Sequence, residues 1–168
     1  MKFLVDANVL SEPTKPVPAK QVVDWLRDNE KKNMLKDVSR QFDAEMRRKT
    51  INYMTINRAS YPSFKNEFEF QKMRLAEKIL SRKAFYMISK HQVNRQKTKI
   101  INGDIIAFST KDEGLDVAHL GFALWQGKHL HLLHASRKEG AVVISKKTLV
   151  AYLKSNKKFT GIIIARFS

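Results

Sequence analysis

Residues 119–136, HLGFALWQGKHLHLLHAS, decide the fold of the second half of this chain. Two runs rich in β-forming residues flank Gly127-Lys128, a pair typical of the two-residue turn of a β-hairpin. With that turn, the two residue numbers of each facing pair add up to 255, so that His119 faces Ser136. Because side chains alternate between the faces of a sheet, His119, His134 and Ser136 are predicted to share one face.

The same register makes His119 and His134 diagonal neighbours, about 7–8 Å apart between their backbones and within reach of long side chains. Gly121 lies between them and leaves space for the two rings. Two imidazoles in this arrangement suit a catalytic base and the group that orients it. A three-residue turn would reverse the parity and pair His119 with His131 instead.

Two other interpretations of the histidines compete with catalysis. A histidine on a strand is more often a packing residue than a catalyst. A zinc site is disfavoured, because His131 and His134 are three residues apart and point to opposite faces of a strand. The sequence pattern does not fix the position of His91 relative to the hairpin, so His91 cannot be counted as a further zinc ligand. The sequence therefore predicts no metal and no cofactor at this hairpin.

Outward from the hairpin, the second half of the chain reads as short strands. Gly103, Gly114, Gly127, Gly140 and Gly161 lie near their ends, and a short helix is predicted at 146–154. The β-rich runs are at 85–88, 105–108, 119–125, 130–135, 142–144 and 161–167. They predict a mostly antiparallel sheet of six strands.

The first half reads as mainly helical. Amphipathic periodicity predicts helices at 19–32, 34–47 and, most strongly, 65–82. A strand is predicted at 2–10, KFLVDANVL, before a proline-rich connector. Helices followed by strands indicate an α+β fold, with a helical N-terminal half packed on the sheet.

The composition limits the functions that are open to the chain. Lys and Arg number 32 against 16 Asp and Glu, a net charge of +16, which attracts polyanions of any kind. The chain has no cysteine, which excludes disulfides, thiolate zinc sites and thiol nucleophiles. No apolar run approaches the roughly 18 residues of a membrane span. The first residues do not form a secretory signal, so a cytoplasmic location is expected for the chain as written.

Three ordered motifs resemble bacterial N-acetylmuramoyl-L-alanine amidase-like proteins, which belong with the NlpC-type papain-like cell-wall hydrolases. The motifs are NGDII at 102–106, GLDVAHLGF at 114–122 and HLLHAS at 131–136. Similarity extends back through SYPSFK, INYMT and DNEKKNMLKDVSR, and so covers residues 24–168. The resemblance implies a papain-like fold and hydrolysis of peptidoglycan amide bonds by Cys-His-His chemistry.

By this resemblance His119 is the general base and His134, in the HAS element, orients it. Ser136 is a possible substrate contact, whereas Gly103-Asp104 is a structural turn at a strand entry. The nucleophile of the family is a cysteine on a helix upstream of the DNEKK-like segment, and this chain has none. The resemblance thus implies a truncated, catalytically incomplete relative that lacks the nucleophile helix and keeps at most some binding of peptidoglycan or muropeptides. Complete relatives are expected to be exported.

The first 30 residues resemble the start of VapC-type PIN-domain toxin ribonucleases, in which an aspartate at the end of the first strand binds magnesium. That position is Asp6, but no later carboxylates follow the pattern, and Asp6 alone cannot hold a catalytic ion. We therefore divide the chain into a PIN-like segment, residues 1–23, and an amidase-like domain, residues 24–168. The two resemblances overlap near residues 23–30, which indicates a chimera.

The missing nucleophile helix would leave one face of the sheet poorly covered, which predicts modest stability or self-association through that face. Two other functions remain open beside the amidase-like one. The charge favours a basic module that binds polyanions without sequence preference. The N-terminal resemblance favours a fragment of a Mg²⁺-dependent ribonuclease.

Overall fold

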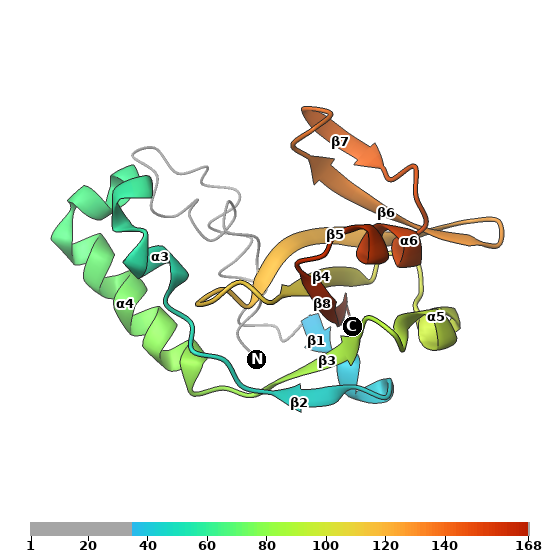
Figure 1. Cartoon of the computed structure of the whole chain (residues 1–168), viewed down its shortest axis with the longest axis horizontal. Helices are drawn as coiled ribbons and strands as arrows, with labels where there is room; N and C mark the ends of the chain where they lie inside the picture. Colours follow the sequence, from blue (N-terminus) through green and yellow to red (C-terminus); the bar gives the residue numbers. More distant parts are fainter. Residues whose placement is uncertain (1–34, 168) are drawn as a thin grey trace.

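The computed structural model describes residues 35–167, which form one large sheet with a helical arm beside it (Figure 1). The order of strands across the sheet is β2-β3-β8-β4-β5-β6-β7, with β1 also paired to β8, and every pair is antiparallel. The strands are β1 (Leu35–Asp37), β2 (Glu45–Arg47), β3 (Phe85–Ser89), β4 (Ile105–Thr110), β5 (Val117–Gln126), β6 (His129–Ser136), β7 (Ala141–Ile144) and β8 (Phe159–Phe167).

The β5–β6 hairpin has the predicted register. Gln126 pairs with His129 and Phe122 with Leu133, so the numbers of facing residues sum to 255. Gly127 occupies the turn with a φ of 57°, a left-handed conformation that glycine adopts without steric cost. The alternative three-residue turn, which would have paired His119 with His131, is therefore wrong.

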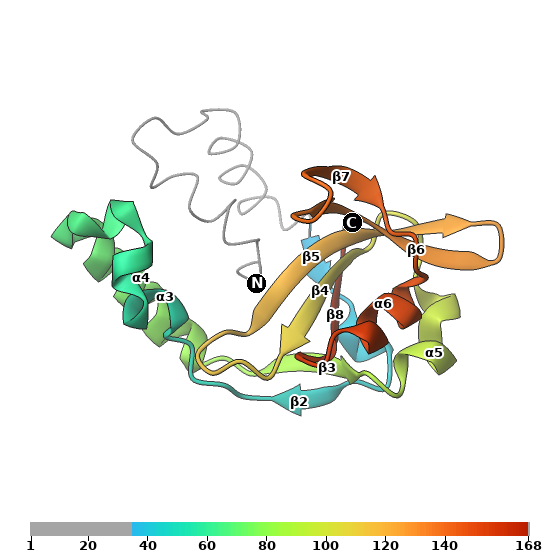
Figure 2. The ribbon, with the colours of Figure 1, turned by 45° about the horizontal axis from the view of Figure 1, so that its top comes forward.

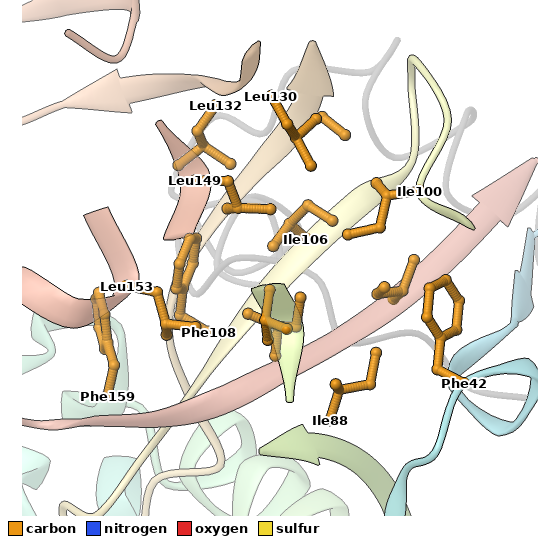
Figure 3. Packing of buried hydrophobic residues seen from close by; sticks show 14 of the residues in the cluster. Phe42, Ile88, Ile100, Ile106, Phe108, Leu130, Leu132, Leu149, Leu153 and Phe159 are labelled. Carbon is orange, nitrogen blue, oxygen red and sulfur yellow. The ribbon is translucent and has the colours of Figure 1, made fainter. Parts of the chain in front are cut away.

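The main core lies on the face of the sheet that carries helix α6 (Leu149–Ser155) and helix α5 (Val93–Gln96) (Figures 2 and 3). Ile106 and Phe108 of β4 and Leu132 of β6 are fully buried there against Leu149 and Leu153 of α6. By the alternation of side chains along β5 and β6, His119 and His134 lie on this same face. The two histidine side chains therefore lie on the same face of the sheet as the main core, not on the opposite face.

The entry to β4 is fixed by a buried ion pair. Arg166 of β8 donates two hydrogen bonds to the Asp104 carboxylate, from Nε at 2.7 Å and from Nη2 at 2.8 Å. The carboxylate is fully buried and also accepts the backbone N–H of Ile101. The Ala123 N–H donates to the Asp104 carbonyl, which ties the start of β4 to β5. Gly103, with a φ of 84°, makes the turn before it. Asp104 therefore has the structural role that the sequence predicted.

The helical arm consists of α3 (Tyr53–Ile56) and α4 (Glu67–Ser81) to one side of the sheet (Figure 1). Helix α4 agrees with the predicted helix at 65–82. Its N-terminus is capped by Asn66, whose side-chain oxygen accepts the N–H groups of Phe68 and Glu69. The buried carboxylate of Glu77 accepts the N–H of Met54 and so joins the two helices. None of the helices described in residues 35–167 is long and apolar enough to cross a membrane.

Three predictions of the fold are wrong. The segment 34–47 is not a helix, because Leu35 and Asp37 pair with β8 and Val38 donates its N–H to Ile164 of the same strand. Its remainder forms the short 3₁₀ turn η2 (Ser39–Gln41) and strand β2. The described part of the N-terminal half is therefore not mainly helical, and the sheet has eight strands instead of six. The predicted strand at 2–10 and helix at 19–32 lie outside the described residues.

The opposite face of the sheet carries a second, smaller apolar cluster. Met87, Ala107 and Ile163 are buried in it, with Val117 and Leu120 packed against them. The sequence predicted poor cover of one face of the sheet, without identifying which. Self-association through such a face stays a prediction.

Candidate functional site

The structure brings His119 and His134 into direct contact. Nε2 of His119 lies 2.8 Å from Nδ1 of His134, a hydrogen-bond distance, and the two rings are perpendicular with centroids 4.9 Å apart. The residues come from neighbouring strands of one hairpin, as diagonal neighbours in the register described above. The predicted proximity is thus present, while the catalytic roles of the two residues remain predictions.

Gly121 has a different role from the one that the sequence suggested. A Cβ at this position would lie 2.7 Å from the Leu132 side chain and 2.9 Å from the carbonyl oxygen of Leu133. Both distances are closer than real Cβ contacts. Glycine at 121 therefore admits a buried leucine from β6, rather than leaving free space for the histidine rings.

Aromatic rings surround the histidine pair. Tyr152 of α6 lies 5.2 Å from His134 and 6.0 Å from His119 between ring centroids. Phe108 of β4 lies 5.8 Å from His119 and contacts Tyr152 and Phe159. Burial raises the pKa of the Tyr152 hydroxyl, so this group stays a neutral hydrogen-bond donor at neutral pH. Tyr152 is not among the predicted site residues, and its only signal in the sequence is its place in the predicted helix at 146–154.

The environment of His134 favours the neutral imidazole. Its side chain is buried, and desolvation lowers its pKa below the ordinary 6.5, with a backbone hydrogen bond at Ala135 acting in the opposite direction. When neutral with its proton on Nε2, His134 can accept a hydrogen bond at Nδ1 from the Nε2–H of His119. That hydrogen bond leaves Nδ1 of His119 in the unprotonated form, which is the form a general base requires.

A cavity of about 310 Å³ opens beside the pair. Ser136, the predicted substrate contact, lines it together with both histidines and Tyr152. Ser136 also accepts the backbone N–H of Glu139 at 3.3 Å, which holds the start of the turn after β6. The described residues that line the cavity include three cations, Arg137, Lys138 and Lys158, and no carboxylate, and Lys158 is ion-paired with Asp112 at 3.1 Å. The arrangement thus favours a ligand that carries negative charge.

The other predicted groups do not join this site. His131 bonds through Nδ1 to the Ser145 carbonyl at 2.8 Å, which is a structural contact. His91 is exposed in a different part of the fold. Within residues 35–167 no three His, Asp or Glu side chains gather as a metal site would require. Asp6 lies outside the described residues. The sequence contains no cysteine, so no thiol stands beside His119.

Comparisons with known proteins point to one family. The family model for N-acetylmuramoyl-L-alanine amidase-like proteins matches residues 21–162. Two crystal structures of an N-acetylmuramoyl-L-alanine amidase from Bacteroides uniformis are each 34% identical, with TM-scores of 0.77 and 0.78 over 88% of this chain and 63% of theirs. A candidate xylanase from Bacteroides fragilis is 37% identical, with a TM-score of 0.76 over 87% of this chain and 64% of that one.

The names of these structures disagree about the bond that is cleaved, and the family model agrees with the amidase name. The chain spans somewhat less than two thirds of the length of the solved structures that it matches. A comparison with curated proteins gives no significant match.

Proposed function

Because the chain belongs to the N-acetylmuramoyl-L-alanine amidase-like family, whose model matches residues 21–162, we propose that its histidine hairpin is directed at amide bonds of peptidoglycan. In complete relatives of the family, the residue that corresponds to His119 would be the general base of Cys-His-His chemistry in a papain-like site, and the residue that corresponds to His134 would orient it. The observation that carries this proposal is the 2.8 Å contact between Nε2 of His119 and Nδ1 of His134.

The chemistry of the pair follows from the protonation of His134. A neutral His134 with its own proton on Nε2 accepts a hydrogen bond at Nδ1, which holds the proton of His119 on Nε2 and leaves Nδ1 of His119 as its unprotonated nitrogen, the form in which a base takes a proton from a nucleophile. A charged His134 donates from both nitrogens and would force the opposite tautomer on His119. The burial that lowers the pKa of His134 therefore supports the base.

We propose that these 168 residues bind peptidoglycan peptides without cleaving their amide bonds. Amide hydrolysis of this class needs a thiolate to form the acyl intermediate, and the sequence supplies no cysteine. The cavity beside the pair supplies hydrogen-bonding groups from Ser136 and Tyr152 and positive charge from Arg137 and Lys138. Such a lining suits a short peptide that bears free carboxylates, as the stem peptides of peptidoglycan do.

The test combines product analysis with binding. Wild type, His119→Ala and His134→Ala are incubated with peptidoglycan and a synthetic muramoyl dipeptide, products are followed by mass spectrometry, and binding is followed by isothermal calorimetry. His91→Ala, which changes an exposed histidine elsewhere, is the matched control. We expect no cleavage, measurable binding by wild type and control, and weaker binding by both site variants.

Two results would contradict this proposal. Absence of muropeptide binding would remove the wall-directed role. Cleavage that is lost only in His119→Ala would show that another nucleophile, or water, works with this base, and that the chain is an active hydrolase.

A basic polyanion-binding module is the second candidate, and the net charge of +16 favours it. Its affinity for any polyanion would fall steeply with salt, and affinity independent of salt would exclude it.

A Mg²⁺-dependent ribonuclease would need further carboxylates beside Asp6. Loss of RNA cleavage in Asp6→Ala would be its signature, and we expect no cleavage in either form. Self-association through the face of Met87 and Ile163 would appear as dimer in analytical ultracentrifugation.

A further inference from the structure

A second hollow, of about 240 Å³, lies along α6 apart from the histidine cavity. Helix α6 contributes Tyr152 to the histidine cavity, whereas Val150, Ala151 and Lys154 line the second hollow. The other walls come from α5 and the 3₁₀ turn η5 (Lys97–Lys99), and from the tip of the β5–β6 hairpin. No residue of the histidine pair takes part in it.

Three lysines from three separate elements converge on this hollow. Lys97 begins η5, Lys128 is in the β5–β6 turn and Lys154 lies in α6. Among the described residues that line the hollow there is no aspartate or glutamate. Gathering three like charges in one concavity costs electrostatic free energy, and a bound anion recovers it.

These ammonium groups differ from other lysines of the fold. Lys49 donates to three backbone carbonyls, of Thr110, Asp112 and Leu115, and Lys90 donates to the carbonyls of Asn156 and Phe159. Within residues 35–167, the ammonium groups of the three lysines around the second hollow make no hydrogen bond or ion pair. Their donors are therefore available to a ligand.

The neutral residues narrow the class of ligand. The Thr148 hydroxyl accepts the N–H of Ala151, which leaves its proton to donate, and Asn94 adds an amide. The apolar part of the lining comes from Leu130, which is buried, and from Val150 and Ala151. Donors from several directions match the oxygens of a tetrahedral phosphate better than the two oxygens of a planar carboxylate, and lysine binds phosphate as a point charge. The apolar part of the lining suits a carbon skeleton.

We propose that this hollow is a binding site for a phosphate ester of a small sugar or polyol, held by Lys97, Lys128 and Lys154. The site is independent of the amidase-like function and goes beyond non-specific attraction by the net charge, because it has a fixed place in the fold. The same chemistry occurs in a soluble ester and in a phosphodiester chain, and the experiment separates these two sources.

The test is a calorimetric titration at fixed ionic strength with inorganic phosphate, glycerol 3-phosphate and a poly(glycerol phosphate) chain. The site variant carries Lys97→Gln, Lys128→Gln and Lys154→Gln. The matched control carries Lys65→Gln, Lys78→Gln and Lys83→Gln, which remove the same charge from exposed positions around α4. Circular dichroism confirms that each variant folds.

We expect glycerol 3-phosphate to bind more tightly than inorganic phosphate, and the site variant to lose at least about tenfold in affinity while the control loses less than about twofold. If poly(glycerol phosphate) binds more tightly per phosphate than glycerol 3-phosphate, the ligand is a polymer. If the two probes bind equally tightly per phosphate, the ligand is a soluble ester. Equal losses in the two variants, or no binding of any probe by wild type, would overturn the proposal.

Discussion

Replacing Asp104 with alanine should destabilise the fold strongly. The Asp104 side chain is fully buried and accepts three hydrogen bonds, two from Arg166 and one from the backbone of Ile101. Removing one partner of a buried ion pair costs about 3–5 kcal/mol, because the other charge is left without compensation. The Arg166 side chain keeps 28% of its surface exposed and can turn partly to water. We therefore expect the lower end of that range, about 3 kcal/mol.

The assay is equilibrium unfolding in urea. With a slope of about 2 kcal/mol per molar, typical of a small domain, a loss of about 3 kcal/mol moves the midpoint down by about 1.5 M. Asp112→Ala is the control, because its ion pair with Lys158 lies at the surface and such pairs contribute about 1 kcal/mol or less.

The result that would refute this reasoning is equal destabilisation by the two substitutions, or a loss below about 1 kcal/mol in Asp104→Ala. A second outcome would be as informative. If Asp104→Ala folded normally but lost muropeptide binding, Asp104 would belong to the site rather than to the strand entry.

Three further predictions concern the site and the core. Gly121→Ala should cost about 1–3 kcal/mol in urea unfolding, because the new Cβ meets the Leu132 side chain at 2.7 Å, and an unchanged midpoint would contradict the packing described. Leu153→Ala should cost about 2–5 kcal/mol, since this side chain is fully buried, whereas Val142→Ala, 70% exposed, should stay within about 0.5 kcal/mol. The His134 imidazole should titrate below 6.5 in NMR spectra. Because its folded pKa is depressed, its contribution to stability is complete above the unfolded value of about 6.5 and is lost as the pH falls to the folded pKa, so His134→Gln should flatten the pH dependence of unfolding in that window.

Local patterns were sufficient to predict the histidine contact. A two-residue turn fixes the register of a hairpin, and register fixes which side chains share a face, so the proximity of His119 and His134 followed from parity alone. The long amphipathic helix at 65–82 was predictable for a similar reason, since its period is visible within one segment.

Features that depend on distant segments were not predictable. Residues 34–47 have helical periodicity, yet Ser39 bonds to Ile164 of β8, which lies 125 residues further along the chain, and Leu35 and Val38 also bond to β8; such pairing overrides local propensity. Tyr152 was missed because its contact with His134 depends on how α6 packs across the sheet. The reason for glycine at 121 was also misread, because the position of the Leu132 side chain is not visible in the hairpin pattern.

The position of β8 in the sheet has a consequence for the order of folding. β8 pairs with β3 on one side and β4 on the other, and β4 lies more than 40 residues earlier in the chain. During synthesis the β5–β6 hairpin can close as soon as it leaves the ribosome, because its contacts are local. The edges of β3 and β4 must wait for residues 159–167, and in that interval they expose unpaired backbone that favours aggregation. The hairpin that carries the histidines is thus expected to form first and the centre of the sheet last.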